Sequence, residues 1–188
     1  AGYRANAGDR CYHCKSELFE VLQAMARDEG FDAVASGDNL DDVAPGQHRP
    51  GMKAASEQGV RKPLIEAELG KADIRALADL LGLPNAHKPA APCLASRVPH
   101  GTEVDPQILA RIDRAESGIR ELGFPILRVR HHGDVARVEI PGSELPRAIE
   151  QRHAIVAVCK RAGYRWATLD LAGFRSGSLN VVLAGGES

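Results

Sequence analysis

The residues in this sequence most suited to chemistry are its four cysteines, two of which form the pair Cys11-x-x-Cys14. Two thiols at this spacing can share a metal ion, form a redox-active disulfide or hold part of an iron–sulfur cluster. A thioredoxin-like role requires a strand before the pair, and residues 1–10 show no strand pattern. Two unligated thiols are a further interpretation, and the spacing alone does not decide among these.

A third cysteine, Cys93, extends the set to three possible ligands. A structural zinc site needs a fourth ligand, for which the candidates are His13, His87 and His100. An iron–sulfur cluster held by three thiolates would leave one iron open for an exogenous sulfur. Cys93 also shares a loop with Arg97, and an exposed cysteine near a cation is a nucleophile or a sulfur donor. The alternative for Cys93 is a small buried hydrophobe.

Three carboxylates, Asp38, Asp41 and Asp42, follow an apolar run over Phe31–Ser36 in a loop that begins at Gly37. We interpret the run as a buried strand, and ligands of α/β sheets bind beyond the carboxyl ends of strands. Clustered carboxylates at such a place can hold Mg²⁺ that bridges phosphates, although a solvated acidic turn has the same composition.

Arginines gather in two settings, the non-periodic loops and one face of a predicted hairpin. Guanidinium groups bind phosphate and carboxylate groups with two parallel hydrogen bonds. The hairpin spans 126–131 and 135–140, and either two-residue turn between its strands gives the same alternation of faces. Leu127, Val129, Ala136 and Val138 then share one face, and Arg128, Arg130, Arg137 and Glu139 share the other.

Helical spacing of apolar residues predicts helices over 15–29, 71–81 and 106–122, and a fourth from Ser143 to residue 162. The cysteine pair then lies just before the first helix, and Cys159 lies on the apolar stripe of the fourth, where we expect it in the core. A last strand is predicted over Arg165–Leu171, and residues 85–102 form a long loop of a kind that is often functional. The order indicates half of a parallel α/β sheet followed by a small α+β module.

Composition excludes several classes of protein. The net charge of −1 and the eight aromatic residues among 188 disfavour nucleic acid as a partner. The longest aliphatic stretch, Ala154–Val158, is too short to span a membrane, and no signal peptide is visible. The sparse cysteines indicate a reducing compartment, so we expect a cytoplasmic protein.

Five ordered motifs together resemble a known family, and they extend over nearly all of residues 1–180. They are Arg10-Cys11-Tyr12-His13-Cys14-Lys15, Gly37-Asp38-Asn39-Leu40-Asp41-Asp42 with Val60-Arg61-Lys62-Pro63-Leu64, Lys88-Pro89-Ala90 with Cys93-Leu94-Ala95-Ser96-Arg97, Arg128-Val129-Arg130-His131-His132 with Ala136-Arg137-Val138-Glu139, and Leu169-Asp170-Leu171-Ala172-Gly173-Phe174-Arg175-Ser176-Gly177-Ser178-Leu179-Asn180. The chain is similar to the ATP-dependent sacrificial sulfur transferase of the LarE type, which acts in nickel-pincer cofactor synthesis for lactate racemase.

The resemblance implies a Rossmann-like adenine nucleotide alpha hydrolase fold of the pyrophosphatase-loop (PP-loop) class. Residues 1–102 would be the C-terminal portion of the PP-loop domain, and 103–188 a small α+β domain for substrate binding and homo-oligomerisation. Members adenylate a carboxylate of pyridinium-3,5-biscarboxylate mononucleotide with ATP and release pyrophosphate, and sulfur then displaces AMP to give a thiocarboxylate. Some take the sulfur from the cysteine that matches Cys93, whereas others hold a 4Fe–4S cluster on cysteines that match Cys11, Cys14 and Cys93.

The resemblance also implies roles for single residues. Cys93 would be catalytic, and the nucleotide with Mg²⁺ would lie near Gly37, Asp38, Asp41 and Asp42. The substrate phosphate and carboxylates would be bound by Ser96, Arg97, Arg128 and Arg130. Glu116 and Glu139 would bind metal or orient those arginines. Because the chain has all three cysteines, we favour the cluster form.

Two departures from the family pattern bear on activity. The Ser-Gly-Gly-x-Asp-Ser phosphate-binding loop is absent, so we expect the sequence as given to be N-terminally truncated and inactive in ATP hydrolysis. Asp38 also stands where the family usually has threonine. The competing interpretations are another PP-loop enzyme, for tRNA thiolation or amide formation, and a non-catalytic zinc-stapled oligomerisation module.

Overall fold

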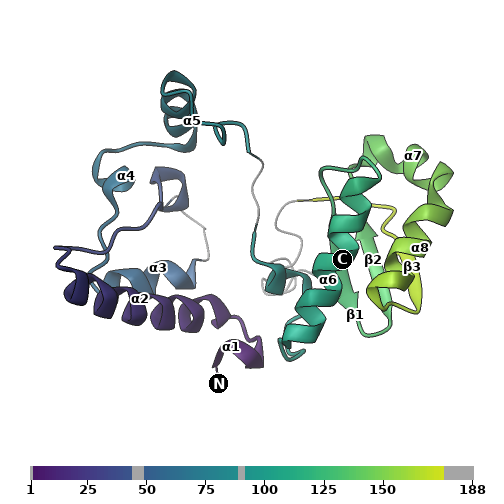
Figure 1. The fold of residues 1–188 in the computed structure, drawn as a ribbon, viewed down its shortest axis with the longest axis horizontal. Helices are drawn as coiled ribbons and strands as arrows, with labels where there is room; N and C mark the ends of the chain where they lie inside the picture. The colour runs from purple at the N-terminus through teal and green to yellow at the C-terminus, as the bar shows by residue number, and fades with distance from the viewer. Residues whose placement is uncertain (1, 44–48, 89–91, 176–188) are drawn as a thin grey trace. The chain divides into compact units, whose positions relative to one another are not determined.

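A computed structural model describes residues 2–43, 49–88 and 92–175. The chain divides into two compact units (Figure 1), an N-terminal unit over Asp9–Ala91 and a C-terminal unit of Tyr3–Gly8 with the chain from Pro92 onward. The division lies before Pro92, eleven residues ahead of the start expected at residue 103, because the turn after Pro92 packs with the later helices and strands. The functions expected of the two domains stay predictions.

The N-terminal unit is built from helices. They are α2 (Arg10–Glu29), η1 (Leu40–Val43), α3 (Pro50–Glu57), α4 (Pro63–Glu66) and α5 (Lys71–Leu80), where η marks a 3₁₀ turn. Helix α2 ends at Gly30, whose φ of 76° makes it a left-handed cap, one residue after the end expected at residue 29. A small core forms where Phe19 and Ala26 of α2 meet Val34, Ala55 and Val60. The burial of these few side chains holds α2 against α3.

Two features of this unit differ from the sequence predictions. Cys11 and Cys14 lie within the first two turns of α2, because the helix begins at Arg10 rather than at Lys15. The strand expected over Phe31–Ser36 is reduced to one parallel bridge between Ala35 and Arg61. A strand requires a partner along its length, and within the described residues only Arg61 pairs with this segment, which leaves Phe31 65% exposed. The Rossmann-like sheet expected here therefore stays a prediction.

The C-terminal unit contains a three-stranded sheet with helices on one face (Figure 1). Its elements are α1 (Gly2–Ala5, of which Tyr3–Ala5 belong here), η2 (Leu94–Arg97), α6 (Pro106–Glu121), β1 (Arg128–His132), β2 (Val135–Glu139), η3 (Gly142–Glu144), α7 (Leu145–Glu150), α8 (Arg152–Ala162) and β3 (Trp166–Leu169). The helix expected from Ser143 is thus divided at Gln151, which has φ −88° and ψ 14°. The α-β-β-α-β order is confirmed.

The hairpin has the alternation of faces that the sequence predicted. Val129 lies opposite Val138, and Arg130 lies opposite Arg137, across a two-residue turn. The valines join α6 and α8 in the core, in which Ile119, Phe124 and Leu127 are almost completely buried. Strand β3 runs parallel to β2 after the α8 crossover. The opposite face of the sheet therefore carries the arginines and is not covered by these helices.

An N-terminal turn supports the loop that follows η2. Asn6 is fully buried, and its side-chain amide donates to the carbonyls of Val98, Pro99 and Thr102 at 3.3, 2.7 and 2.8 Å. Its φ of 55° is left-handed, a conformation that asparagine tolerates better than most residues. This contact fixes the loop that leads from η2 into α6.

Replacement of Asn6 by glycine is expected to lower the free energy of unfolding of the C-terminal unit by about 1–3 kcal/mol, because it leaves buried carbonyls without a donor. Glycine itself accepts the positive φ, so backbone strain does not contribute. Urea denaturation measures the loss. The exposed neighbour Ala7, changed to glycine, is the control for added chain flexibility. An equal loss in both variants would contradict a role for the Asn6 amide.

Candidate functional site

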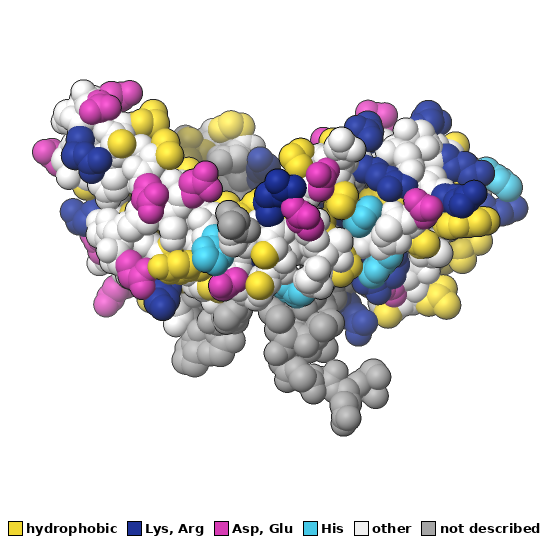
Figure 2. Space-filling model, turned by 90° about the horizontal axis from the view of Figure 1, so that it is seen from below, with side chains coloured by type: hydrophobic (Ala, Val, Ile, Leu, Met, Phe, Trp, Pro, Cys, Tyr) yellow, Lys and Arg dark blue, Asp and Glu magenta, His cyan; other side chains and the backbone are white. Residues whose placement is uncertain are grey.

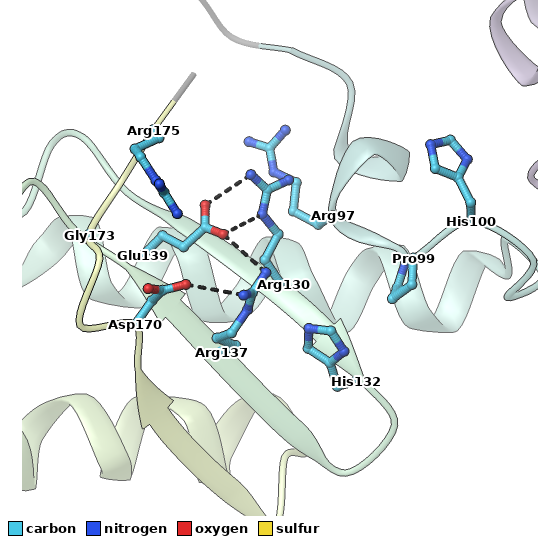
Figure 3. Close-up of a pocket in the computed structure, with 10 residues that line it drawn as sticks. All are labelled: Arg97, Pro99, His100, Arg130, His132, Arg137, Glu139, Asp170, Gly173 and Arg175. Carbon is cyan, nitrogen blue, oxygen red and sulfur yellow. Dashed lines mark hydrogen bonds and ion pairs between the residues drawn. The ribbon is translucent and has the colours of Figure 1, made fainter. Parts of the chain in front are cut away.

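A cavity of about 300 Å³ opens on the arginine-bearing face of the sheet in the C-terminal unit. The loop after η2, the hairpin and the segment after β3 contribute its walls (Figure 3). The lining residues are Arg97, Pro99, His100, Arg130, His132, Arg137, Glu139, Asp170, Gly173 and Arg175. Four arginines against two carboxylates give this lining a net positive charge. Figure 2 likewise shows Lys and Arg side chains gathered over the C-terminal unit. The cavity is therefore suited to an anionic ligand.

A buried carboxylate, Glu116 of α6, positions one wall of this cavity. Its two oxygens accept from Arg97 at 2.8 and 3.2 Å, from Arg120 at 2.6 Å and from the backbone N–H of Val129 at 3.1 Å. Burial alone would raise the pKa of Glu116, but the hydrogen bonds and charge of Arg97 outweigh it and hold this pKa below its ordinary value. Glu116 is thus an anion that joins η2, α6 and β1.

Arg97 uses most of its donors on the protein itself. While Nε and Nη2 bind Glu116, Nη1 donates to the carbonyls of Pro92 and Cys93 at 2.8 and 3.1 Å and to the hydroxyl of Ser96 at 2.9 Å. Its side chain is only 2% exposed. The expected contact of Arg97 with substrate stays a prediction, whereas its hold on the Cys93 turn is observed.

A second arginine–carboxylate chain crosses the sheet on the floor of the cavity (Figure 3). Arg130 of β1 forms two bonds of 2.9 Å with Glu139 of β2, and its Nη1 donates to the Ser96 carbonyl at 2.8 Å. Arg137 bridges Glu139 at 3.3 Å and Asp170 at 3.1 Å. Ser96, Arg97 and Arg130, predicted from distant motifs, are therefore brought together.

Two side chains of the hairpin, one in the cavity lining and one outside it, have lowered pKa values. Burial, followed by the charges of Arg137 and Arg130, lowers the pKa of His132. Burial and the charge of Arg97 likewise lower the pKa of Arg128. Burial is the largest cause of the lowered pKa at both positions, and the positive charges of neighbouring arginines add to it.

Arg128, the fourth predicted substrate residue, does not line the cavity. Its guanidinium lies 5.0 Å from the centre of the Phe174 ring and donates to the Leu127 carbonyl at 2.6 Å. The alternation of the strand correctly placed it on the same face as Arg130. Packing against Phe174, which follows β3, then sets its direction.

Sequence reasoning did not single out the cavity residues His132, Asp170 and Arg175 as site residues. Asp170 and Arg175 belong to the fifth motif, and this was the available signal. The turn at Gly173 returns the chain over the sheet, with φ of 71° and a Cβ position only 3.0 Å from the Ile140 carbonyl. A side chain at this position would be strained by the positive φ and would crowd the Ile140 carbonyl, so glycine favours the turn that brings Arg175 to the cavity.

The thiols are divided between the two units. Cys93 is exposed at the start of η2 in the C-terminal unit, and Cys11 and Cys14 are exposed one helical turn apart on α2 in the N-terminal unit. The pair shares one face of the helix, so it fits two ligand positions of a metal or cluster site. Within the described residues, no group of three or more His, Cys, Asp or Glu is placed to hold a metal ion. The shared cluster stays a prediction.

Two further sequence predictions concern cysteine and metal. Cys159 is buried in the core, as predicted, and burial raises the pKa of its thiol to about 11. For Glu116 and Glu139 we expected either metal binding or orientation of arginines. Their oxygens accept from arginines, which is the orienting arrangement.

In the acidic loop of the N-terminal unit, each predicted carboxylate has a nearby protein partner. Asp38 accepts from the Ser36 hydroxyl at 2.6 Å, and Asp41 accepts from the first N–H of α5, at Lys71, at 2.6 Å. Asp42 accepts from the Asn39 N–H at 3.1 Å and pairs with Arg49 at 2.7 Å. Gly37 lines a second cavity. Magnesium and nucleotide binding by this loop stay predictions.

Other predictions fall on parts of the chain that are not described. Pro89 and Ala90 of the third motif and Ser176–Asn180 of the fifth lie outside the described residues. In the part that is described, no helix is long and apolar enough to cross a membrane.

Comparison with known proteins finds similar sequences in three organisms. The chain is 42% identical over 183 residues to an uncharacterized protein of Synechocystis sp., covering 96% of this chain and 68% of that protein. It is 39% identical over 178 residues to the pyridinium-3,5-bisthiocarboxylic acid mononucleotide synthase of Lactiplantibacillus plantarum, covering 95% of this chain and 64% of that protein. An uncharacterized protein of Methanocaldococcus jannaschii is 29% identical over 171 residues, and the match covers 91% of this chain and 66% of that protein. No family model matches the chain.

The described residues form a mixed fold of helices and a small sheet, consistent with the α/β class, and the C-terminal unit carries a positively charged cavity. On identity and coverage, the chain belongs to the family of these relatives, which contains the mononucleotide synthase. This confirms the family that the motifs indicated. The chain covers about two thirds of the length of these relatives, 68%, 64% and 66% in turn.

Substitution of Glu116 by alanine is expected to cost about 3–5 kcal/mol of stability at neutral pH, because Arg97 would remain buried without its partner. The pKa of Glu116 is lower in the folded protein than its ordinary value of about 4.3. The stabilisation is therefore complete above about pH 4.3, and it is lost as the pH falls through the pKa of the folded state. The difference in the free energy of unfolding between the wild type and the variant should therefore become smaller at acid pH.

Urea denaturation at a series of pH values measures this effect. Glu121→Ala on the same helix is the control, since Glu121 is exposed and should change stability by less than about 0.5 kcal/mol. A gap between wild type and Glu116→Ala that stays constant from neutral to acid pH would contradict the assigned charge of Glu116.

Proposed function

We propose that this chain belongs to an ATP-dependent sulfurtransferase that converts carboxylates of pyridinium-3,5-biscarboxylate mononucleotide into thiocarboxylates, in nickel-pincer cofactor synthesis. The observation that carries the proposal is the joint position of the arginine cavity and Cys93. Arg97 lines the cavity and binds the Cys93 carbonyl at 3.1 Å. Membership of a family that contains a named bisthiocarboxylate synthase supports the same substrate.

The substrate carries a phosphate and two carboxylates, and the cavity offers positive charge for such groups. Arg130 and Arg97 are fixed by Glu139 and Glu116, so they are already oriented before a ligand arrives. Arg175 is exposed and has no ion pair among the described residues. We infer that Arg175 donates directly to the ligand, while the buried pairs supply mainly potential and shape.

The chemistry requires activation of a carboxylate before sulfur can enter. A substrate carboxylate oxygen would attack the α-phosphorus of ATP, and the bond to the departing pyrophosphate would break. A sulfur nucleophile then attacks the acyl carbon, and AMP leaves with the electrons of the carbon–oxygen bond. The positive cavity would bind the carboxylate and the phosphate during both steps.

The sulfur has two possible sources in this chain. If Cys93 donates, the bond between its Cβ and sulfur breaks and loss of the Cα proton leaves dehydroalanine. If Cys11, Cys14 and Cys93 hold a 4Fe–4S cluster, the group supplies a bound sulfide that can be replaced. We favour the second source because the chain carries both members of the Cys11-x-x-Cys14 pair. The family also implies a homo-oligomer, which analytical ultracentrifugation tests.

Arg130→Ala is expected to weaken binding of pyridinium-3,5-biscarboxylate mononucleotide about tenfold or more, because the cavity loses a positive charge and the shape that this side chain gives it. Binding of ATP should change much less. Isothermal titration calorimetry with each ligand measures the two losses. Because Arg130 is buried in an ion pair, the exposed Arg175→Ala is tested alongside it and should give a similar selective loss without unfolding. Equal losses for both ligands would count against the assignment.

Arg161→Ala provides a matched control in the same unit. Arg161 is exposed on α8 and away from the cavity lining. This change removes one positive charge, so it reports the effect of net charge alone. A loss of mononucleotide binding as large as that of Arg175→Ala would show a diffuse charge effect instead of a site.

Metal analysis of anaerobically purified protein distinguishes the sulfur sources. We expect iron with acid-labile sulfide, lost in the Cys11→Ser, Cys14→Ser and Cys93→Ser variants but kept in Cys159→Ser. One zinc per chain would instead indicate a structural staple. Absence of metal, together with loss of the mass of H₂S from Cys93 after turnover of the full-length enzyme, would indicate the sacrificial cysteine.

A further inference from the structure

The chain contains one tryptophan, Trp166, and its side chain is exposed on the sheet that carries the arginine cavity. Trp166 begins β3, at the edge of the sheet (Figure 1), and is 63% exposed, although an indole has a large apolar surface to bury. Among the described residues, the cavity lining and the core of the C-terminal unit are formed by other side chains. Trp166 is therefore an aromatic group for which the proposed function gives no role.

The alternation of β3 places Trp166 on the face of the sheet that bears the arginines. Ala167 and Leu169 pack against the core, on the side of the helices. The alternate residues Trp166 and Thr168 therefore belong to the opposite face. In the register of the sheet, Thr168 lies beside Arg137, which lines the cavity. Trp166 is thus two positions along the strand from the arginines, on the same face.

A row of three residues across the sheet connects Trp166 with the cavity. Val135 of β2 lies beside Trp166 in the parallel register and opposite His132 of β1 in the antiparallel register. His132 lines the cavity, and Val135 is half-buried. The neighbouring row holds Arg130 and Arg137. Because residues two apart on a strand are separated by about 7 Å, the two rows are closer together than the two ends of a mononucleotide.

The backbone of Trp166 is fixed by the hairpin turn. The N–H groups of Arg165 and Trp166 both donate to the carbonyl of Asp134, at 2.9 and 3.0 Å. A carboxylate oxygen of Asp134 lies 3.7 Å from a guanidinium nitrogen of Arg111, which connects the same turn to α6. The indole therefore projects from an ordered strand, and a ligand that contacts it does not have to order a loop.

Three of the other aromatic rings in the C-terminal unit already have a cation over them. A guanidinium carbon lies between 3.9 and 5.0 Å from the ring centre in the pairs Arg147 with Phe124, Arg111 with Tyr164 and Arg128 with Phe174. Among the cation–ring and ring–ring contacts of the described residues, none includes Trp166. An indole face attracts a cation more strongly than the other aromatic side chains do. The ring best suited to a cation is thus available to one from outside the chain.

The proposed substrate has a ring that suits this position. A pyridinium ring is flat and carries a positive charge, which the arginines of the cavity would repel. The phosphate and carboxylates of the same molecule, by contrast, suit those arginines. Such a ligand needs a cationic environment for its anions and an aromatic one for its ring. The two neighbouring rows of the sheet offer both.

We propose that Trp166 forms a subsite beside the arginine cavity, in which the indole face binds the cationic ring of an N-ribosyl pyridinium ligand while the arginines bind its phosphate and carboxylates. The identity of the ring rests on the proposed function. Trp166 is then a residue that determines specificity, because an indole face attracts a charged ring more strongly than a neutral ring of similar shape.

Fluorescence of the full chain tests the subsite directly, because Trp166 is its only tryptophan. A pyridinium ring in contact with an indole accepts an electron from its excited state and quenches its emission. Pyridinium-3-carboxylate mononucleotide is expected to quench the emission along a saturable curve. N-Methylpyridinium has the ring without the anions, so it should quench by collision alone, without saturation. The subsite is rejected if calorimetry finds no binding of the mononucleotide, or finds binding that leaves the emission unchanged.

Trp166→Ala is expected to weaken binding of the same mononucleotide about three- to tenfold in isothermal titration calorimetry, and Trp166→Phe should restore part of the loss. Ribose 5-phosphate has no ring, so its affinity should stay the same. Ile149→Ala is the matched control, because Ile149 of α7 is an apolar residue that is 53% exposed and lies outside the cavity lining. An equal loss in the control would count against a specific role for Trp166. Urea denaturation checks that each variant is folded.

Orotidine 5′-monophosphate separates the charge of the ring from its shape, because it carries a phosphate and a carboxylate on a neutral ring. Its affinity should fall less in Trp166→Ala than that of the pyridinium mononucleotide. An equal fall would overturn the cation-binding role and indicate a general stacking surface.

The connection between the subsite and the cavity has its own test. Saturable quenching by the pyridinium mononucleotide should weaken in Arg175→Ala but not in Arg161→Ala, because only Arg175 lines the cavity. Quenching that Arg175→Ala leaves unchanged would place the ring at a site separate from the arginines and would overturn the proposal.

The subsite and the proposed function fail in different experiments. Thiocarboxylate formation by the full-length enzyme, with the same KM for the pyridinium substrate in wild type and in Trp166→Ala, would reject the subsite and keep the function. Binding of the pyridinium mononucleotide that depends on Trp166, in an enzyme that forms no thiocarboxylate, would keep the subsite and reject the function. Altered sedimentation of Trp166→Ala with unchanged ligand binding would instead assign the indole to a contact between chains.

Discussion

The ion pair between Glu116 and Arg97 is the interaction on which the arrangement of the C-terminal unit depends. Both side chains are almost completely buried, and the carboxylate also binds Arg120 and the backbone of β1. Two buried charges are costly unless all their hydrogen bonds are made, and here Arg97 makes the rest with the turn that carries Cys93. Helix α6, strand β1 and the Cys93 turn therefore cannot move independently. A single buried pair thus connects the turn that carries Cys93 to the sheet that bears the arginines.

The arginine cavity shows how positive charge can be held close together without a ligand. Arg130 and Arg137 would repel each other across the hairpin, but Glu139 lies between them and Asp170 binds the outer one. The carboxylates reduce the repulsion and fix the guanidinium directions, while the lining keeps a net positive charge. A ligand then meets oriented groups and does not have to order them, which lowers the entropic cost of binding. Burial is the main reason that the pKa of His132 is lowered, and the charges of Arg137 and Arg130 lower it further.

In the N-terminal unit, the acidic loop lies beside the second cavity, whose lining includes Lys71, Arg75 and Lys88. Asp41 binds the start of α5 and Asp42 binds both Asn39 and Arg49. These carboxylates hold the loop in place and stay outside the cavity lining, so its cations are left without counter-charges. Clustered aspartates in the sequence are typical of a magnesium site, which stays a prediction, and in the fold the same residues also hold the loop against α5. Composition alone could not distinguish these roles, since it does not show which backbone N–H groups lie nearby.

Features that follow from local periodicity were predictable from the order of the amino acids. The alternation of Val129 with Arg130 and of Val138 with Glu139 fixed which face of the hairpin is buried, because a strand has a period of two. Helix ends depend on the capping residues next to them in the sequence. Gly30 ends α2, and Asp105 with Pro106 begins α6. Folding determined which arginines line the cavity, since Arg128 packs against Phe174 and Arg175 comes from the chain after β3. It also decided that Phe31–Ser36 pairs at one bridge, because a strand is defined by hydrogen bonds to a partner distant in sequence. Local geometry can be read from neighbouring residues, but burial and pairing depend on residues that only folding brings together.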